Sequence, residues 1–147
     1  GDGSYLMMNS DIYSTVLTGH KLIVVVMDNG GFAVINRLQN AKGIPSFNNQ
    51  IKDSRIRHAV DVDFAAHAAS MGALTRSVES LTDLEDALRW AKGADRTTVI
   101  VVKTDAHAWT PGDAWWDVGV PEVSARKEVE KARAEQEQGR RRQRVGV

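Results

Sequence analysis

Two short glycine-rich stretches carry the residues of this sequence that are best suited to chemistry. The first is Gly1-Asp2-Gly3-Ser4, and the second is Asp28-Asn29-Gly30-Gly31-Phe32, which follows the apolar run of residues 22–27. Asp2 and Asn29 stand 27 positions apart and supply one carboxylate and one carboxamide oxygen. Hard oxygen ligands beside exposed backbone N–H groups are what a magnesium diphosphate requires.

The glycines and Ser4 fit the same chemistry. Gly1 and Gly3 have no Cβ, so a diphosphate can approach their backbone closely. Ser4 adds a hydroxyl donor, and the start of a following helix adds its positive dipole end. The alternative is that both stretches are ordinary turns between strands and helices. The spacing of Asp2 and Asn29 around a buried strand favours a phosphate site over that alternative.

The order of the expected elements indicates an α/β domain with a parallel sheet. Apolar residues at helical spacing predict helices, and continuous β-branched runs predict strands that are covered on both faces. Thr82 and Glu85 form a capping-box pattern at the start of one helix, and Ser124 and Gly139 bound the last helix. We expect helices at residues 5–19, 32–38, 63–71, 82–92 and 124–138, strands at 22–27, 73–78 and 97–102, and a long loop at 39–61. Helices thus alternate with strands.

One strand is missing from this pattern. A turn that binds phosphate is expected to follow a strand and to open a helix, yet Gly1 is the first residue of the sequence. We therefore expect an N-terminally truncated domain, with the preceding strand outside this sequence.

Composition excludes several classes of site. The 147 residues suit one domain, and 42% hydrophobic with 26% charged residues is typical of a globular protein. The absence of cysteine excludes disulfides, thiolate metal sites and a cysteine nucleophile. The longest apolar run has six residues and no charged-then-apolar leader opens the chain, so we expect a cytoplasmic protein.

The C-terminal tail is basic. Residues 125–147 hold eight Lys and Arg and four Glu, a net charge of +4, so the preceding residues carry −4 because the whole chain is neutral. Such a tail can bind nucleic acid or an anionic surface. No aromatic residues are interleaved with these charges, so we expect a solvated charged helix and no nucleic-acid partner.

The two glycine-rich stretches together resemble the signature of thiamine-diphosphate enzymes, which is Gly-Asp-Gly, a spacer of this size and Asn-Asn. Asp28 stands where the family has its first Asn, and Asn29 is the second. The resemblance implies that Mg²⁺ is held by the Asp2 carboxylate, the Asn29 side chain and the Gly31 backbone carbonyl. It also implies a cofactor-binding set for thiamine diphosphate, namely Gly1, Gly3, Ser4, Asn29, Gly30, Gly31 and Phe32.

The resemblance extends over nearly all of the chain up to Ser124. It implies a doubly wound parallel sheet of the diphosphate-binding type, with a partial domain at residues 1–124 and a charged helix and basic tail at 125–147. The member most resembled is a hydrolase related to acetolactate synthases, which opens a cyclic 1,2-dione in inositol catabolism. The implied product is 5-deoxyglucuronic acid. The alternatives are an acetolactate-synthase-like or decarboxylase-like activity and a non-catalytic phosphate-binding module.

The same resemblance implies that this chain is one part of a three-domain enzyme. In the family, a glutamate that activates the cofactor lies in a pyrimidine-binding domain, usually that of a partner subunit. No residue here is therefore assigned a catalytic role, and Asp11, which stands where relatives often have Glu, is not that residue. We expect a cyclic dione as substrate, a homodimer or homotetramer, no membrane partner, and no activity from this chain alone.

Other candidate sites have structural alternatives. The four histidines do not fall at a metal-ligand spacing. Asp61 and Asp63 suit acid–base work or a solvated helix start, and Trp115-Trp116 suit a substrate pocket or core packing. The stretch Lys103 to Thr110 follows a parallel strand, at the sheet edge where α/β proteins bind ligands.

Overall fold

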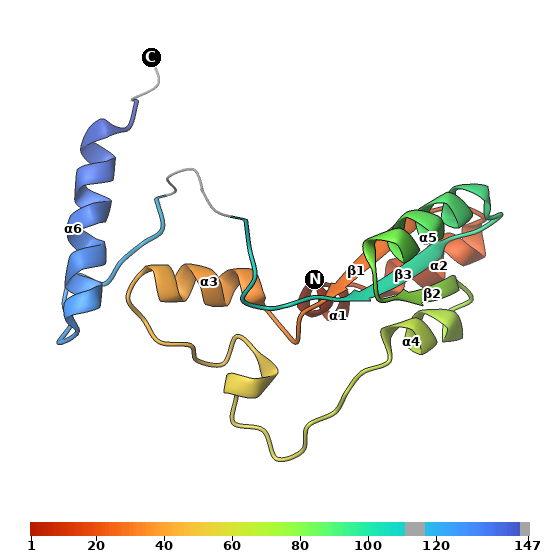
Figure 1. Cartoon of the computed structure of the whole chain (residues 1–147), viewed down its shortest axis with the longest axis horizontal. Coiled ribbons are helices and arrows are strands. Elements are labelled where there is room, and N and C mark those ends of the chain that lie inside the picture. The colour runs from red at the N-terminus through yellow and green to blue at the C-terminus, as the bar shows by residue number, and fades with distance from the viewer. Residues whose placement is uncertain (111–116, 145–147) are drawn as a thin grey trace. The chain divides into compact units, whose positions relative to one another are not determined.

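The computed structural model describes residues 1–110 and 117–144 (Figure 1). These residues divide into two compact units. The first, here called the sheet unit, contains Gly1–Phe32 and Arg55–Ala106. The second, here called the helical unit, contains Ala33–Ser54 and the chain from His107 onward. All residues of the two glycine-rich stretches belong to the sheet unit.

The sheet unit is built on three parallel strands, as the sequence predicts. They are β1 (Ile23–Asp28), β2 (Leu74–Val78) and β3 (Thr98–Lys103), in the order β1-β3-β2. Ile100 of β3 pairs with Val25 on one side and with Arg76 on the other. Because β3 lies between two neighbours and under helices, its first four residues are all buried, which explains its uninterrupted β-branched sequence.

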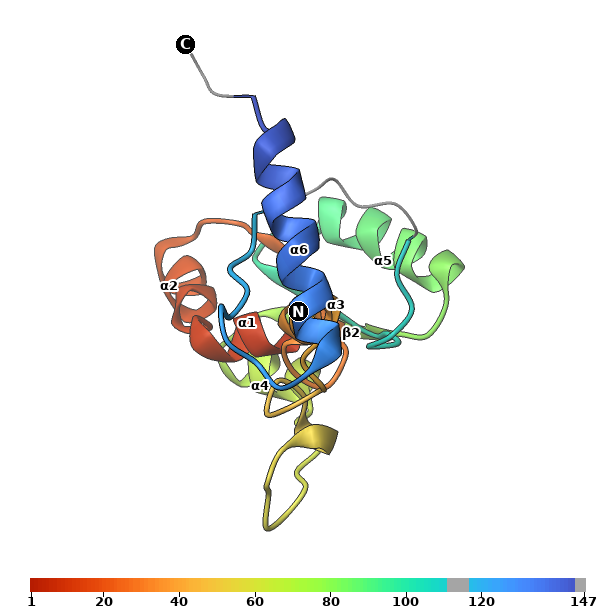
Figure 2. The same ribbon diagram turned by 90° about the vertical axis from the view of Figure 1, so that its left-hand side faces the viewer.

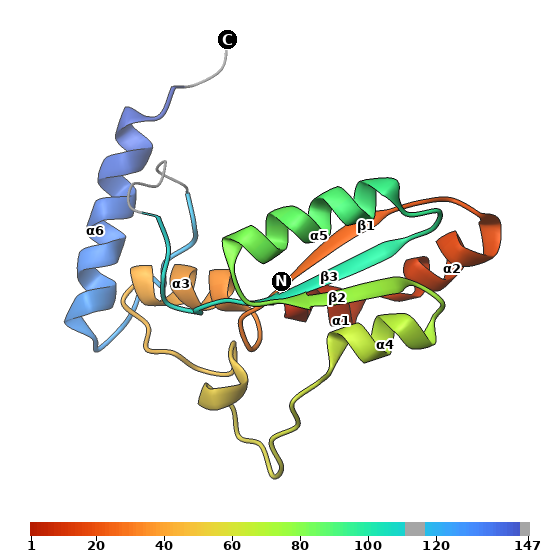
Figure 3. The ribbon, with the colours of Figure 1, turned by 45° about the vertical axis from the view of Figure 1, so that its right-hand side comes forward.

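Helices cover both faces of this sheet (Figure 3). On one face lie α1 (Asp2–Met7), α2 (Ser10–Thr18) and α4 (Phe64–Ser70), and on the other lies α5 (Leu81–Gly93). Successive side chains of a strand point to opposite faces, so Val99 and Val101 join the first core and Ile100 joins the second. The first core also contains Tyr5, Ile12 and Phe64. The predicted doubly wound α/β fold is thereby confirmed.

The prediction of one helix at residues 5–19 is wrong, because two helices cover this stretch. Met8 has a non-helical backbone with φ −152° and ψ 68°, which separates α1 from α2, and α1 begins at Asp2. Tyr5 and Ile12 are seven positions apart and face the same core, so the apolar pattern runs across the break and conceals it. The predicted end is confirmed, since Gly19 adopts a left-handed φ of 71° after Thr18.

The cap predicted for α5 is also wrong. The helix begins at Leu81, and Ser80 rather than Thr82 is its N-cap. The Ser80 hydroxyl accepts a hydrogen bond of 3.1 Å from the Asp83 backbone nitrogen and donates one of 2.7 Å to the Asp83 carboxylate. This Ser-x-x-Asp pair satisfies the free N–H groups two residues earlier than the predicted Thr-x-x-Glu pair.

The helical unit contains α3 (Ala33–Ala41), the single 3-10 turn η1 (Ile51–Asp53) and α6 (Lys127–Arg142). The predicted boundaries of α6 are wrong at both ends. Ser124 Oγ accepts from the Arg126 nitrogen at 3.1 Å, but the helix starts only at Lys127. It then continues without a break through Gly139 (Figure 2).

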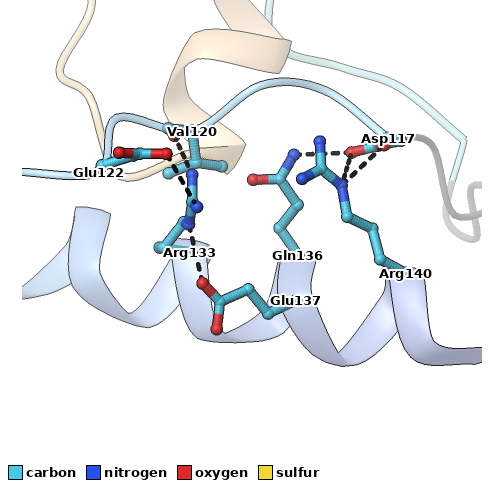
Figure 4. Close-up of polar contacts among 7 residues, drawn as sticks. All are labelled: Asp117, Val120, Glu122, Arg133, Gln136, Glu137 and Arg140. Atoms are coloured by element: carbon cyan, nitrogen blue, oxygen red, sulfur yellow. Dashed lines mark hydrogen bonds and ion pairs between the residues drawn. The ribbon is translucent and has the colours of Figure 1, made fainter.

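Contacts from Gln136 and Arg140, which lie on either side of Gly139 in the sequence, accompany this continuation (Figure 4). Arg140 donates to Asp117 Oδ2 at 2.9 Å, and Gln136 donates to Asp117 Oδ1 at 2.6 Å. These contacts hold the last turn of α6, which offsets the roughly 1 kcal/mol that a glycine costs inside a helix.

The helical unit also has a small core, formed by Val120, Val129 and Ala132 with Ile44 against it. Arg133 donates to the Val120 carbonyl at 3.0 Å, and its other nitrogens contact Glu122 and Glu137 (Figure 4). One face of the predicted charged helix is therefore packed. The domain boundary predicted at residue 124 stays a prediction. None of the described helices is both long enough and apolar enough to cross a membrane.

Candidate functional site

The two glycine-rich stretches meet at one edge of the sheet unit. Asp2 is the first residue of α1, and Asn29 follows the last residue of β1. The backbone nitrogen of Asn29 donates a hydrogen bond of 3.0 Å to Asp2 Oδ1. Asp2 is only 3% exposed. The buried carboxylate therefore ties the start of α1 to the end of β1.

Three oxygen-bearing groups converge beside this bond. In one orientation of the Asn29 amide, its side-chain oxygen lies 3.1 Å from Asp2 Oδ1 and 3.1 Å from the Gly31 carbonyl oxygen. Turning the amide over places its nitrogen there, and that nitrogen donates to both oxygens. The donors expected for Mg²⁺ are thus brought together.

The spacing of these groups can be compared with the geometry of magnesium. An octahedral Mg²⁺ with bonds of 2.0–2.1 Å separates adjacent ligand oxygens by about 3 Å. With the Asn29 nitrogen in place, the 3.1 Å distances are ordinary hydrogen-bond lengths, and with its oxygen turned there they are compatible with this value. The residues present therefore fit a magnesium ion.

The glycines of the site have a steric role. A Cβ on Gly3 would lie 2.8 Å from the Phe32 ring and 3.1 Å from the Gly31 carbonyl oxygen, so only glycine allows α1 to pass this close to the loop. Gly30 and Gly31 have positive φ values of 78° and 138°, which L-residues rarely adopt. Gly1 is different, since a Cβ there would make only ordinary contacts of 3.8 Å or more.

Ser4 lies exposed in the first turn of α1, and Phe32 is 38% exposed beside Gly3. These two members of the expected cofactor-binding set are therefore accessible to a ligand. The seven residues of that set all lie at the start of α1 or in the loop after β1.

Asp28 takes part in the loop without joining the three converging groups. Its Oδ1 accepts a hydrogen bond of 3.4 Å from the Gly30 nitrogen, and its carbonyl accepts one of 2.8 Å from the Thr104 nitrogen. Burial, and then the neighbouring Asp2 carboxylate, raise the pKa of Asp28 above its ordinary value. These hydrogen bonds indicate that Asp28 has a structural role in the turn.

A cavity of about 270 Å³ lies at the carboxyl ends of the three strands. Asp28, Asp61, Asp63 and Lys103 are among its lining residues. Lys103 Nζ contacts Asp61 Oδ2 at 3.2 Å, whereas Asp63 caps α4 by accepting from the Ala66 nitrogen at 2.8 Å. Asp61 and Asp63 therefore have separate partners, and Asp63 has the structural role that a helix start implies.

Sequence reasoning missed Ser77, which also lines this cavity. Ser77 belongs to no motif, and its place in β2, one residue before the end of the strand, is the signal that points to it. Of the stretch Lys103 to Thr110, only Lys103 is among the lining residues, so a ligand-binding role for that stretch stays a prediction.

The remaining candidates do not form a site among the described residues. His67 Nδ1 lies 2.8 Å from the Tyr5 hydroxyl, His20 contacts Thr18, and His107 contacts Lys52. Residues 1–110 and 117–144 contain no group of three or more His, Asp or Glu that could hold a metal. The pair Trp115-Trp116 lies outside the described residues.

Comparison with known proteins agrees with this geometry. Residues 1–102 match the family described as thiamine pyrophosphate enzyme, C-terminal TPP binding domain. The chain is 37% identical over 139 residues to 3D-(3,5/4)-trihydroxycyclohexane-1,2-dione hydrolase 2 of Bacillus cereus, which covers 90% of this chain and 22% of that protein. It is 38% identical over 135 residues to 3D-(3,5/4)-trihydroxycyclohexane-1,2-dione hydrolase of Bacillus subtilis, covering 90% of this chain and 21% of that protein. The chain thus spans about a fifth of the length of these relatives.

Proposed function

This chain belongs to the C-terminal TPP-binding domains of thiamine pyrophosphate enzymes, and we propose that it holds the magnesium–diphosphate end of thiamine diphosphate. In this proposal Asp2, the Asn29 side chain and the Gly31 carbonyl are the protein ligands of Mg²⁺. The observation that carries it is the convergence of these three groups at 3.1 Å.

The glycine-rich stretches would hold the diphosphate itself. Positive φ values at Gly30 and Gly31 turn the chain sharply after β1, and successive N–H groups in such turns form concavities that bind anions. The exposed Ser4 hydroxyl is a further donor. A Cβ at Gly1 would meet no steric barrier, which fits a glycine kept for the approach of a ligand.

The chemistry of the whole protein is a further part of the proposal. When bound, thiamine diphosphate supplies a nucleophilic carbon and a ring that accepts electrons. This chain would contribute to the reaction by orienting the cofactor, because Asp2 and Asn29 would fix its diphosphate end at the sheet edge. We propose that the complete protein is a hydrolase that opens trihydroxycyclohexane-1,2-dione to 5-deoxyglucuronate in inositol catabolism.

The assembly belongs to the same proposal. A pyrimidine-binding domain of a partner subunit would complete the cofactor site, in a homodimer or homotetramer. No carboxylate of this chain is assigned the activation of the cofactor. We therefore propose that the chain is a part of the enzyme that binds but does not turn over substrate by itself.

The test is a binding measurement on the 147-residue chain. Mg²⁺ and thiamine diphosphate together should raise the melting temperature more than either does alone, because a ligand that binds only the folded state stabilises it. Thiamine monophosphate with Mg²⁺ is the control that lacks the second phosphate. Mn²⁺ in place of Mg²⁺ gives a direct readout, since bound Mn²⁺ changes the relaxation of water protons.

Two variants separate the proposed site from the rest of the chain. Asp2→Ala should abolish the stabilisation by the cofactor pair. Asp11→Ala, an exposed aspartate in the first turn of α2, should keep it. If Asp2→Ala responds as the parent does, the assignment of the metal ligands is wrong.

A further inference from the structure

The cavity at the carboxyl ends of the strands is not used by the proposed metal and diphosphate site. Residues from β1, β2 and β3 all reach it, together with the residues that lead into α4. Its volume of about 270 Å³ is near the lower end of ligand pockets, which begin at about 300 Å³. A cavity of that volume suits a small molecule rather than a segment of a macromolecule.

The polar side chains of the cavity include both acceptors and donors. Asp28 and Asp61 supply carboxylate oxygens, and Lys103 and Ser77 supply an ammonium and a hydroxyl. Lys103 Nζ and Asp61 Oδ2 are 3.2 Å apart, and both side chains are largely exposed. A hydroxyl group placed beside this pair can donate to the carboxylate and accept from the ammonium at the same time.

The other part of the lining is apolar. Phe64 and Val101 are buried core residues that present one side to the cavity. Such a surface matches the C–H face of a ring, while the polar groups match its substituents. The cavity thus combines an apolar wall with a rim of paired donors and acceptors.

Other classes of ligand fit this lining less well. An anion would meet the carboxylates of Asp28, Asp61 and Asp63 against the single ammonium of Lys103. A divalent cation would meet that ammonium, and the described residues contain no group of three metal-binding side chains. A purely apolar ligand would cover the Lys103–Asp61 pair without a hydrogen bond to either group. A neutral molecule with several hydroxyl groups avoids all three conflicts.

We propose that this cavity binds a neutral cyclic polyol, with ring hydroxyls bridging the Lys103 ammonium and the Asp61 carboxylate. The inference deepens the proposed function and rests on it for the link between this cavity and a reaction. Asp28 lines the cavity and precedes Asn29 directly, so the polyol and the diphosphate end would be bound by neighbouring residues of one loop. The cavity would then hold the hydroxylated part of the substrate.

Binding of myo-inositol to the ¹⁵N-labelled 147-residue chain tests this inference. Amide chemical shifts should change with the concentration of myo-inositol at Phe64, Ser77 and Val101, with a Kd in the millimolar range of a small neutral ligand. Cyclohexanol, which has a single hydroxyl on the same ring size, should bind about tenfold more weakly.

Variants of the exposed pair locate the site. Lys103→Met and Asp61→Ala should each weaken myo-inositol binding by about tenfold, since each removes one side of the hydroxyl contact. Asp95→Ala, which removes another exposed ion pair, with Arg96, is the matched control and should bind as the parent does. Changes in shift spread evenly over the chain, or binding unchanged in Lys103→Met, would overturn the inference.

A crossed comparison separates this inference from the proposed function. Asp2→Ala should lose the response to Mg²⁺ and thiamine diphosphate but keep myo-inositol binding, whereas Lys103→Met should do the reverse. If cyclohexylamine, a cation of the same ring size, binds the cavity more tightly than myo-inositol, the polyol assignment is wrong even where the cofactor site is correct.

Discussion

Asp2 and Asn29 are 27 residues apart in the chain, yet the buried Asp2 carboxylate accepts a hydrogen bond of 3.0 Å from the Asn29 backbone nitrogen. This bond joins the two glycine-rich stretches at the proposed site through the protein's own groups. A site whose ligands are already positioned loses less entropy on binding.

The first prediction concerns the stability of this link. Asp2→Ala removes the acceptor of the Asn29 nitrogen, so it should lower the free energy of unfolding by about 1–3 kcal/mol in the absence of ligands. Urea unfolding followed by circular dichroism measures the loss. Asp11→Ala, which is exposed, should change the free energy by no more than about 0.5 kcal/mol. Equal effects of the two changes would mean that the Asp2 bond contributes nothing.

The second prediction tests the close approach at Gly3. Gly3→Ala places a Cβ 2.8 Å from the Phe32 ring, and overpacking of this kind typically costs about 1–3 kcal/mol. Because the obstacle is a side chain, Phe32→Ala should relieve part of that cost. A double-mutant cycle from urea unfolding gives the coupling energy between the two positions. Coupling near zero would contradict the contact.

The sequence predicts the parts of the fold that depend on continuous patterns. The β-branched runs at residues 22–27 and 97–102 predict parallel strands covered on both faces, and β1 and β3 lie there. Only β3 is largely buried, whereas β1 lies at the edge of the sheet and has a single buried residue, Val26. The break at Met8 leaves no such trace, since Tyr5 and Ile12 keep helical spacing across it. Ser80 with Asp83 and Thr82 with Glu85 are equivalent cap patterns, and the end of β2 at Val78 decides between them.

Some residues of the candidate site can likewise be predicted from a continuous motif, and others cannot. Asp2, Asn29 and Gly31 belong to a motif, and parallel strands bring the ends of such motifs to one edge. Ser77 and Lys103 meet in the cavity only because β2 and β3 pair in a particular register, with Ser77 opposite Val101. Register is a property of the folded sheet, so the sequence places Ser77 and Lys103 near strand ends but does not show that they line the same cavity.

A third prediction concerns Gly43 in the helical unit. Gly43 has a φ of 79°, and a Cβ there would lie 2.6 Å from the Val129 nitrogen and closer still to the Glu128 carbonyl group. Gly43→Ala should therefore destabilise the packing of α6 by more than 1 kcal/mol. Hydrogen exchange of the α6 amides measures the change. Gly93→Ala, at the end of α5 with open space around it, should be neutral or slightly stabilising.

The fourth prediction is a pH dependence in the same unit. The hydrogen bond from Gln136 and then the one from Arg140 lower the pKa of Asp117 below its ordinary value. A carboxyl group with a lowered pKa in the folded state stabilises the fold above its unfolded pKa of about 3.9. That stabilisation is lost as the pH falls through the folded pKa. Helicity of α6 should thus decline below about pH 4, and Asp117→Asn should flatten the decline. An unchanged acid transition in Asp117→Asn would show that this contact does not hold α6.

The last prediction concerns activity. We expect that the 147-residue chain does not release acid from trihydroxycyclohexane-1,2-dione, even with Mg²⁺ and thiamine diphosphate present. In the proposed site Asp2, Asn29 and Gly31 would anchor only the diphosphate end of the cofactor, and a misplacement of about 1 Å at the reacting atoms can cost about a hundredfold in rate. The longer protein that contains this domain should release acid, measured by titration at constant pH, and Asn29→Ala should abolish that release. The matched variant Asn48→Ala, in the long loop of the helical unit, should retain it. Turnover by the 147-residue chain at a rate near that of the longer protein would contradict the proposal that a second domain completes the site.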